Sequence, residues 1–296
     1  MSIKLNILTP LEPYSFRGIN FLLKRDDLIN KELSGNKARK AHYLIDNPPI
    51  DKDSIVSYGS IQSNAMYSLS FIAKELGLKF YYYANHIPNL LKESPRGNLS
   101  LALKNKMILK EDYSNIEEKS NSILIKEGIA EELSYYGIEK LAKELIEQVD
   151  ANTKYQLFLP SGTGTTALYL SKALKLLCSK IEVYTTPCVG DRDYLLKQFR
   201  ELEPNSSYYP KILDTQKRYY FGKLYREFYL LWLELQKELG IEFELLYDPK
   251  AWIVTLDNRE LLGNLIYIHQ GGIMGNNSMI ERYIRKFGEK YEDYRE

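Results

Sequence analysis

The sequence predicts an α/β protein in which helices pack on mostly parallel sheets. Three observations favour this class. Short apolar strand patterns alternate with helical patterns along almost the whole chain, and glycines stand at several turns from strand to helix. The hydrophobic fraction is 44% over 296 residues, which is enough for one large core or two modest ones. No repeat, low-complexity tract or proline-rich linker divides the chain, so any domain boundary has to follow from topology.

Each element is predicted from its hydrophobic period. The stretch 62–76 places Met66, Leu69, Ile72 and Leu76 on one helical face, and Gly77 follows it as a stop signal. In chain order the patterns predict strand 19–24, helix 36–45, strand 54–58, helix 62–76, strand 79–84, helix 90–104, strands 107–109 and 122–126, helix 138–149, strand 155–159, helix 163–177, strand 181–185, helices 191–202 and 224–239, and strand 264–269.

Charge and cysteine content exclude several classes of function. The chain has 40 Lys and Arg against 39 Asp and Glu, a net charge of +1, so no basic excess points to nucleic acid. Two cysteines, Cys178 and Cys188, are too few for a metal cluster, and no metal is expected. We interpret both as reduced thiols of a cytoplasmic protein. No signal-like segment and no apolar run of spanning length is seen, so no membrane contact is expected.

One lysine stands in an unusual position. Lys37 follows Ser34, Gly35 and Asn36 at the predicted start of a helix, which Ser34 or Asn36 would cap. A cation there opposes the helix dipole, and the same location lowers the pKa of a lysine and favours the free amine that Schiff-base chemistry requires. The alternative is an ordinary basic helix start.

A glycine-rich turn lies far downstream, between the predicted strand 155–159 and an apolar helix. Its residues are Ser161, Gly162, Thr163, Gly164, Thr165 and Thr166. Backbone N–H groups, threonine hydroxyls and a helix N-terminus together suit an anion, although a simple strand-to-helix turn remains the alternative. The turn lacks the lysine of a P-loop and the third glycine of a dinucleotide fingerprint. No acid ends the strand 181–184, which speaks against a nucleotide-binding protein. An amine and an anion cradle together suit pyridoxal 5′-phosphate, with its one aldehyde and one phosphate.

Several runs resemble the family of 1-aminocyclopropane-1-carboxylate (ACC) deaminases and D-cysteine desulfhydrases. These are fold-type II pyridoxal-phosphate enzymes, relatives of tryptophan synthase β. The runs, in the family's order, are Arg25-Asp26-Asp27-Leu28 with Ser34-Gly35-Asn36-Lys37-Ala38-Arg39-Lys40, Tyr58-Gly59-Ser60-Ile61-Gln62-Ser63-Asn64, Ile125-Lys126-Glu127-Gly128, the turn 161–166, Leu246-Tyr247-Asp248-Pro249-Lys250 and His269-Gln270-Gly271-Gly272. Together they extend from residue 25 to residue 272.

The resemblance implies a role for each matching position. Lys37 would be the Schiff-base lysine, and Tyr247 and Ser63 would share catalysis with it. The residues implied to hold the cofactor are Lys37, Asn64, the turn Ser161, Gly162, Thr163, Gly164, Thr165 and Thr166, and Asp248 and Gln270 beside the pyridine ring. Those implied to contact the substrate are Gln62, Ser63, Asn64 and Tyr247. Without the other matches, Ser63-Asn64 is equally a helix cap and Tyr247 a core aromatic residue.

Some positions depart from the family's pattern. Ala65 replaces a frequent histidine, Ile129 replaces a glycine, and Phe221 stands where some members have a second active-site tyrosine. Two positions separate the members of the family. ACC deaminases have an acid directly after the tyrosine, and they have leucine as the second residue of His-x-Gly-Gly. D-Cysteine desulfhydrases have threonine at both positions. Asp248 follows the deaminase pattern and Gln270 follows neither, so the choice of substrate stays open.

The resemblance also implies the domain plan and the activity. Residues 41–148 would form a small domain, and residues 1–40 with 149–296 a large cofactor-binding domain, with the cofactor in the cleft between them. The expected activity is deamination of a small amino acid, D-cysteine or ACC, to a 2-oxo acid and ammonia by a homodimer. The alternative is a degenerate member that binds pyridoxal phosphate without efficient turnover.

Overall fold

The computed structural model describes residues 3–112, 116 and 121–288. Its strands are β1 (Leu11–Phe16), β2 (Ile19–Arg25), β3 (Ser54–Tyr58), β4 (Lys79–Ala84), β5 (Ile108–Glu111), β6 (Ser122–Ile125), β7 (Tyr155–Ser161), β8 (Ile181–Pro187), β9 (Lys211–Ile212) and β10 (Leu265–His269). Its α-helices are α1 (Gly35–Lys40), α2 (His42–Asp46), α3 (Asn64–Glu75), α4 (Asn89–Glu93), α5 (Gly97–Lys104), α6 (Ser134–Gln148), α7 (Thr165–Leu176), α8 (Arg192–Leu202), α9 (Arg226–Leu239), α10 (Asp248–Asp257) and α11 (Asn276–Phe287). None of these helices combines the length and hydrophobicity needed to cross a bilayer.

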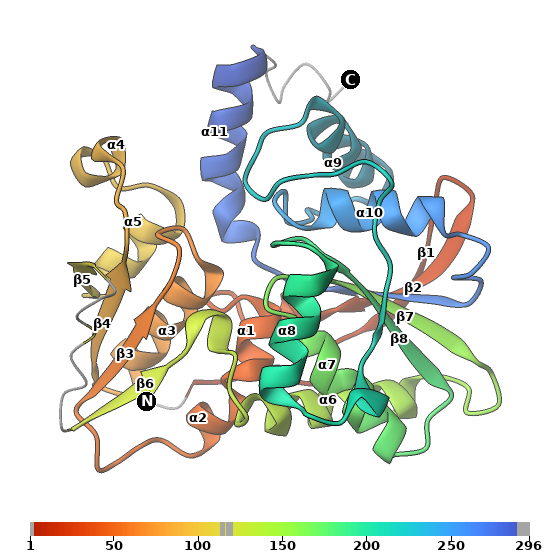
Figure 1. The fold of residues 1–296 in the computed structure, drawn as a ribbon, viewed down its shortest axis with the longest axis horizontal. Helices are drawn as coiled ribbons and strands as arrows, with labels where there is room; N and C mark the ends of the chain where they lie inside the picture. Colours follow the sequence, from red (N-terminus) through yellow and green to blue (C-terminus); the bar gives the residue numbers. More distant parts are fainter. Residues whose placement is uncertain (1–2, 113–115, 117–120, 289–296) are drawn as a thin grey trace.

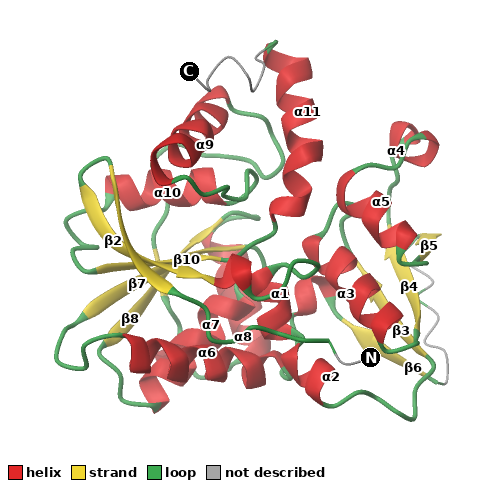
Figure 2. Cartoon of the chain, turned by 180° about the vertical axis from the view of Figure 1, so that it is seen from behind, coloured by secondary structure: helices red, strands yellow, loops and turns green. Residues whose placement is uncertain are grey.

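The strands form two separate sheets. A six-stranded sheet has the order β1-β2-β10-β7-β8-β9, in which only the β1–β2 hairpin is antiparallel. A four-stranded sheet, β5-β4-β3-β6, is parallel throughout. Figure 1 shows the two sheets on either side of α1 and α11, and Figure 2 shows the same division from behind. The α/β class and the mostly parallel sheets predicted from the sequence are confirmed.

Helices cover both faces of the six-stranded sheet, α9 and α10 above it and α6, α7 and α8 below it in Figure 1. The strands supply the two cores alternately, as the period of two requires. In β10, Tyr267 packs with Trp252 of α10, whereas Ile266 and Ile268 belong to the cluster between the sheet and helices α6 and α7. Both faces of this sheet are therefore buried.

A third core lies around the four-stranded sheet, where Ile55 and Phe80 pack with Leu69 and Ile72 of α3. Helix α6, which we expected in the small domain, instead shares the hydrophobic cluster of α7 and the six-stranded sheet. The domain boundaries stay a proposal, and the packing of α6 favours a boundary before Ser134 over one after residue 148.

Two predicted helices are interrupted in the structure. The stretch 36–45 divides at Ala41 into α1 and α2, and the stretch 90–104 divides into α4 and α5. Pro95 explains the second break, because proline disfavours helical geometry in the residue before it and cannot donate its own backbone hydrogen bond. Strand β1 and helices α10 and α11 were not predicted. Pro249 lies in the first turn of α10, where proline is tolerated.

A buried ionic network fixes α1 against β2 and α6. Arg39 of α1 donates to both carboxylate oxygens of Asp26, at 3.1 and 2.7 Å, and its guanidinium lies 2.8 Å from Glu144 of α6. Lys24 of β2 contacts Glu144 at 2.5 Å, and Thr9 donates to Asp26 at 2.8 Å. Thus the Arg-Asp-Asp and Lys-Ala-Arg runs meet in the core, and the network positions the helix that carries Lys37.

Replacing Arg39 by methionine is expected to destabilise the protein by about 3–5 kcal/mol, since Asp26 is then left buried without its main partner. Urea unfolding followed by circular dichroism measures the change. The matched control is Arg17→Met, which removes a partly exposed pair with Glu234 and should cost about 1 kcal/mol or less. Equal losses in the two variants would contradict a structural role for the network.

Candidate active site

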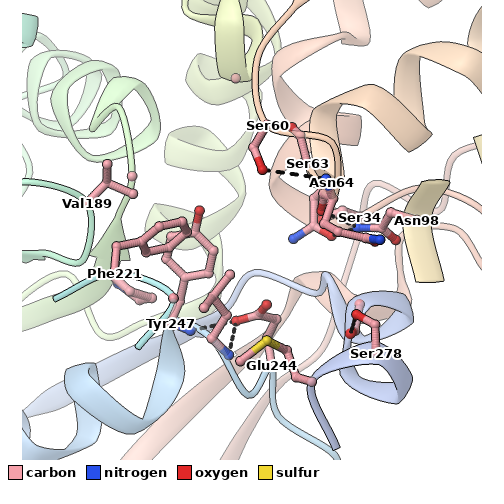
Figure 3. A pocket seen from close by; sticks show the side chains of 18 of the residues that line it. Ser34, Ser60, Ser63, Asn64, Asn98, Val189, Phe221, Glu244, Tyr247 and Ser278 are labelled. Atoms are coloured by element: carbon pink, nitrogen blue, oxygen red, sulfur yellow. Dashed lines mark hydrogen bonds between the residues drawn. The ribbon is translucent and has the colours of Figure 1, made fainter. Parts of the chain in front are cut away.

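A cavity of about 780 Å³ lies between the two sheets. Its walls come from the N-terminal ends of α1, α3 and α7, from the segment that opens α10, from the end of β10, and from α5 and α11. Figure 3 shows Tyr247 and Phe221 on one wall, across from Ser34, Ser63 and Asn64 on the other. Helix N-termini converge here, so the cavity suits anionic groups. The described residues form no cluster of His, Cys, Asp and Glu suited to a metal ion.

Lys37 projects into this cavity from the first turn of α1. Its amine donates to Asn36 Oδ1 at 3.1 Å. Burial lowers the pKa of Lys37 to about 8, and the nearby Glu244 opposes that change. About a tenth of the amine is therefore free at pH 7, far more than for an ordinary lysine, and a lysine nucleophile reacts as the free amine.

The turn from β7 to α7 lies in the same cavity, and Gly162, Thr163, Gly164, Thr165 and Thr166 all line it. Thr163 and Thr165 are linked by their hydroxyls at 3.0 Å. Ser161 differs, because its buried hydroxyl bonds to the Thr185 hydroxyl at 2.6 Å inside the sheet. The turn thus offers hydroxyls and the N-terminal N–H groups of a twelve-residue helix.

The two glycines of this turn have different tasks. A side chain at Gly164 would point away from the anion cradle. A Cβ atom there would lie 2.4 Å from Leu195 and 2.5 Å from Phe199 of α8, at a φ of +74°. Gly164 is therefore required for core packing. A Cβ atom on Gly162 would instead face the Tyr247 hydroxyl at 3.4 Å.

Lys40 is a site residue that the sequence analysis missed. It lies one helical turn after Lys37, it lines the cavity, and its amine is 2.7 Å from the Gly128 carbonyl and 3.5 Å from the Thr163 hydroxyl. Burial and the charge of Lys37 hold the pKa of Lys40 well below its ordinary value. The i, i+3 spacing of the two lysines in the Lys-Ala-Arg-Lys run is the signal that predicts a shared helix face.

Ser63 is the N-cap of α3, and its hydroxyl accepts from the backbone N–H groups of Ala65 and Met66 at 3.1 and 3.4 Å. The helix-cap alternative is thus true, and Ser63 also lines the cavity. Asn64 accepts from Asn98 at 2.8 Å, and the Gln62 side chain donates to the Arg96 carbonyl at 3.0 Å. All three residues lie in the cavity wall, with the amides of Asn64 and Gln62 held by α5 and its cap.

Tyr247 precedes α10 and its ring packs on Phe221, with centroids 5.4 Å apart. Burial raises the pKa of Tyr247 well above its ordinary value, so the hydroxyl stays protonated at neutral pH. It is a proton donor rather than a base. Phe221 supplies an apolar contact at the position where some members of the resembled family have a second active-site tyrosine.

Asp248 and Gln270 both line the cavity, and both have internal partners. Asp248 accepts from the Tyr267 hydroxyl at 2.6 Å and from the backbone N–H of Glu244 at 2.9 Å. Burial raises the pKa of Asp248. The Gln270 amide donates to the Pro160 carbonyl at 2.7 Å and accepts from Asn36 at 3.1 Å. Their expected position beside a pyridine ring stays a prediction.

Glu244 is a second residue that the sequence analysis missed. It accepts from the backbone N–H groups of Leu246 and Tyr247 at 2.8 and 2.6 Å, and so holds the turn that presents Tyr247. Burial and the nearby Asp248 raise the pKa of Glu244 to about 8. The carboxyl is mainly neutral at pH 7. No motif in the sequence marks it, because its role depends on the fold.

Comparison with known proteins supports the resemblance. No known family model matches the chain. A bifunctional D-cysteine desulfhydrase/1-aminocyclopropane-1-carboxylate deaminase of Arabidopsis thaliana is 24% identical, over 95% of this chain and 80% of its own length. The crystal structure of an ACC deaminase homologue superposes with a TM-score of 0.74 at 21% identity, covering 96% of each chain. A threonine deaminase of Solanum lycopersicum gives 0.67 at 12% identity, covering 96% of this chain and 91% of its own.

These matches confirm the resemblance stated from the sequence, and they confirm the predicted fold, fold type II.

Proposed function

We propose that the chain is a pyridoxal-phosphate-dependent deaminase or desulfhydrase. It acts on a small amino acid, D-cysteine or ACC, and releases a 2-oxo acid and ammonia. The observation that carries this proposal is the convergence of Lys37, the turn residues 162–166, Ser63 and Tyr247 on one cavity. We also propose that it is a cytoplasmic homodimer.

The cavity fits pyridoxal phosphate at both of the cofactor's reactive ends. The phosphate would bind to the N-terminus of α7, with Lys40 beside Thr163 adding a cation. Gly162, in the same turn, leaves room for the Tyr247 side chain, because a Cβ atom there would lie 3.4 Å from its hydroxyl. Lys37 would bond to the aldehyde carbon, and Asp248 or Gln270 would adjoin the ring.

When bound, pyridoxal phosphate withdraws electrons from the α-carbon of an attached amino acid. The protein's residues divide the remaining work. The Lys37 amine takes or returns a proton, and the Tyr247 hydroxyl donates one. The Ser63 hydroxyl and the N-terminus of α3 hold the substrate carboxylate. The ring of Phe221 packs against Tyr247 and gives it an apolar neighbour.

The variant Gly162→Val is expected to weaken binding of pyridoxine 5′-phosphate about ten- to a hundred-fold, because valine fills the space between the phosphate turn and Tyr247. This probe has the phosphate but no aldehyde, so equilibrium dialysis reports the cradle alone. The control is Gly263→Val, at a position with nothing within 4 Å of an added Cβ atom. Unchanged affinity in Gly162→Val would exclude this cradle.

Attachment of the cofactor to Lys37 should depend on pH with a half-point near 8, the lowered pKa of this amine. Below that pH the protonated amine does not react, so the attachment rate falls about tenfold per pH unit. Rapid-mixing absorbance measures the rate. In Glu244→Gln the half-point should move to lower pH, since Glu244 is partly ionised near pH 8 and its carboxylate favours the ammonium. A half-point near 10 would identify an exposed lysine instead.

The activity is tested by offering the loaded protein ACC, D-cysteine and D-serine and measuring 2-oxo acid and ammonia. Turnover of at least one is expected. D-Cysteine is slightly favoured, because loss of a good leaving group demands less than opening a cyclopropane ring, although Asp248 favours the deaminase pattern. Failure on all three with cofactor bound would support the alternative, a protein that only binds pyridoxal phosphate. The presence of Lys37, Ser63 and Tyr247 in one cavity favours the enzyme.

A further inference from the structure

A chain of hydrogen bonds leads from the backbone of β7 to the amine of Lys37. The Gln270 side chain donates to the Pro160 carbonyl at 2.7 Å. Asn36 donates its amide N–H to Gln270 Oε1 at 3.1 Å, and Asn36 Oδ1 accepts from Lys37 Nζ at 3.1 Å. The backbone supports this contact, because Asn36 N–H also donates to the Gln270 carbonyl at 3.0 Å. Gln270 thus holds Asn36 by both main chain and side chain.

The first hydrogen bond of the series determines which group donates and which accepts in the others. A backbone carbonyl such as that of Pro160 can only accept, so the Gln270 amide must turn its nitrogen toward it and its oxygen toward Asn36. Asn36 must then present its nitrogen to Gln270, which leaves its oxygen for Lys37 and for the Ser34 hydroxyl, 3.2 Å away. The hydroxyl can donate or accept, so it does not fix the orientation of the amide by itself. An amide without such a partner can rotate by 180° and exchange its donor and acceptor. A leucine or threonine at position 270 cannot impose this order, because neither side chain has an amide.

We propose that Gln270 is a positioning residue, which orients the Asn36 amide so that its oxygen, and not its nitrogen, faces the Lys37 amine. This role explains why residue 270 departs from both patterns of the family that the chain resembles. This proposal for Gln270 rests on the proposed function of Lys37. Gln270 thereby acts on the lysine without touching the reacting atoms.

The test titrates Lys37 in the full-length, cofactor-free protein. Formaldehyde and cyanoborohydride methylate free amines, and peptide mass spectrometry gives the extent at Lys37 from pH 6 to 10, with the exposed Lys197 as internal standard. In Gln270→Met the half-point at Lys37 is expected to fall by about one pH unit, because the ammonium loses a fixed acceptor. In the Asn36→Ala background, Gln270→Met should cause no further shift.

Two results would overturn the proposal: no shift in Gln270→Met, or an equal shift with and without Asn36. The second would mean that the substitution acts through packing. Gln270→Glu is a check that is independent of the Met variant's folding. Its carboxylate still accepts from Asn36, so the half-point should not fall, and a fall would contradict the proposed orientation. Because the titration needs neither cofactor nor turnover, failure of the proposed function leaves it interpretable.

Discussion

Replacing Lys37 by alanine is expected to abolish turnover and, with it, the absorbance at about 410–420 nm that bound pyridoxal phosphate contributes. The amine is the group that reacts with the aldehyde, and none of its neighbours replaces it. Lys40 lies one turn away, but its amine is held by the Gly128 carbonyl at 2.7 Å, and burial is the main cause of its lowered pKa, ahead of the charge of Lys37. The turn 161–166 remains, so weak non-covalent binding of the cofactor should persist. Absorbance spectra and steady-state assays of the same preparation measure both effects.

The matched control is Lys31→Ala, an exposed lysine six residues earlier, which should leave spectrum and turnover unchanged. Lys40→Ala is not a control, since that residue lies beside the proposed phosphate site. Survival of both colour and turnover in Lys37→Ala would assign the chemistry to another lysine.

Tyr247→Phe is expected to lower kcat by about 10²–10⁴-fold while cofactor binding is retained, because the variant removes one proton donor and little volume. The raised pKa of Tyr247 keeps its hydroxyl protonated, so the loss should extend across neutral pH. Packing on Phe221 is preserved in the phenylalanine variant. Steady-state kinetics on the best substrate measure the effect.

Tyr169→Phe makes the same chemical change on α7, outside the cavity wall. Its buried hydroxyl has no hydrogen-bond partner among the described residues, so kcat should stay as in the unmodified protein. If Tyr247→Phe also kept its full rate, the proton donor would have to be another group, and the neutral carboxyl of Glu244 would be the next candidate.

The sequence predicted those features that depend on local pattern. Strands β3 and β4 have the predicted bounds, because each is a short apolar run followed by a polar or glycine turn. The glycine turn opens α7 as expected, and the motif residues of the site other than Ser161 meet in one cavity. The spacing of the motifs does not show that Lys37 and Tyr247 lie in one site. That prediction came from the family resemblance.

The features that were missed depend on long-range packing. Glu144 is 120 residues from Lys24 in the chain, and only the fold reveals that the two form a buried pair. The need for glycine at position 164 comes from the side chains of α8. The role of Gln270 follows from a carbonyl on another strand. In each case the tertiary structure determines which residue is the partner. The local hydrophobic period of the sequence does not indicate it.

Lys37 is expected to bond covalently to pyridoxal phosphate in this cavity. The most direct measurement is reduction of the loaded protein with borohydride, followed by proteolysis and peptide mass spectrometry. The phosphopyridoxyl group is expected on the peptide that contains Lys37. Its presence on another lysine, or its absence from every peptide of a cofactor-loaded sample, would contradict the account.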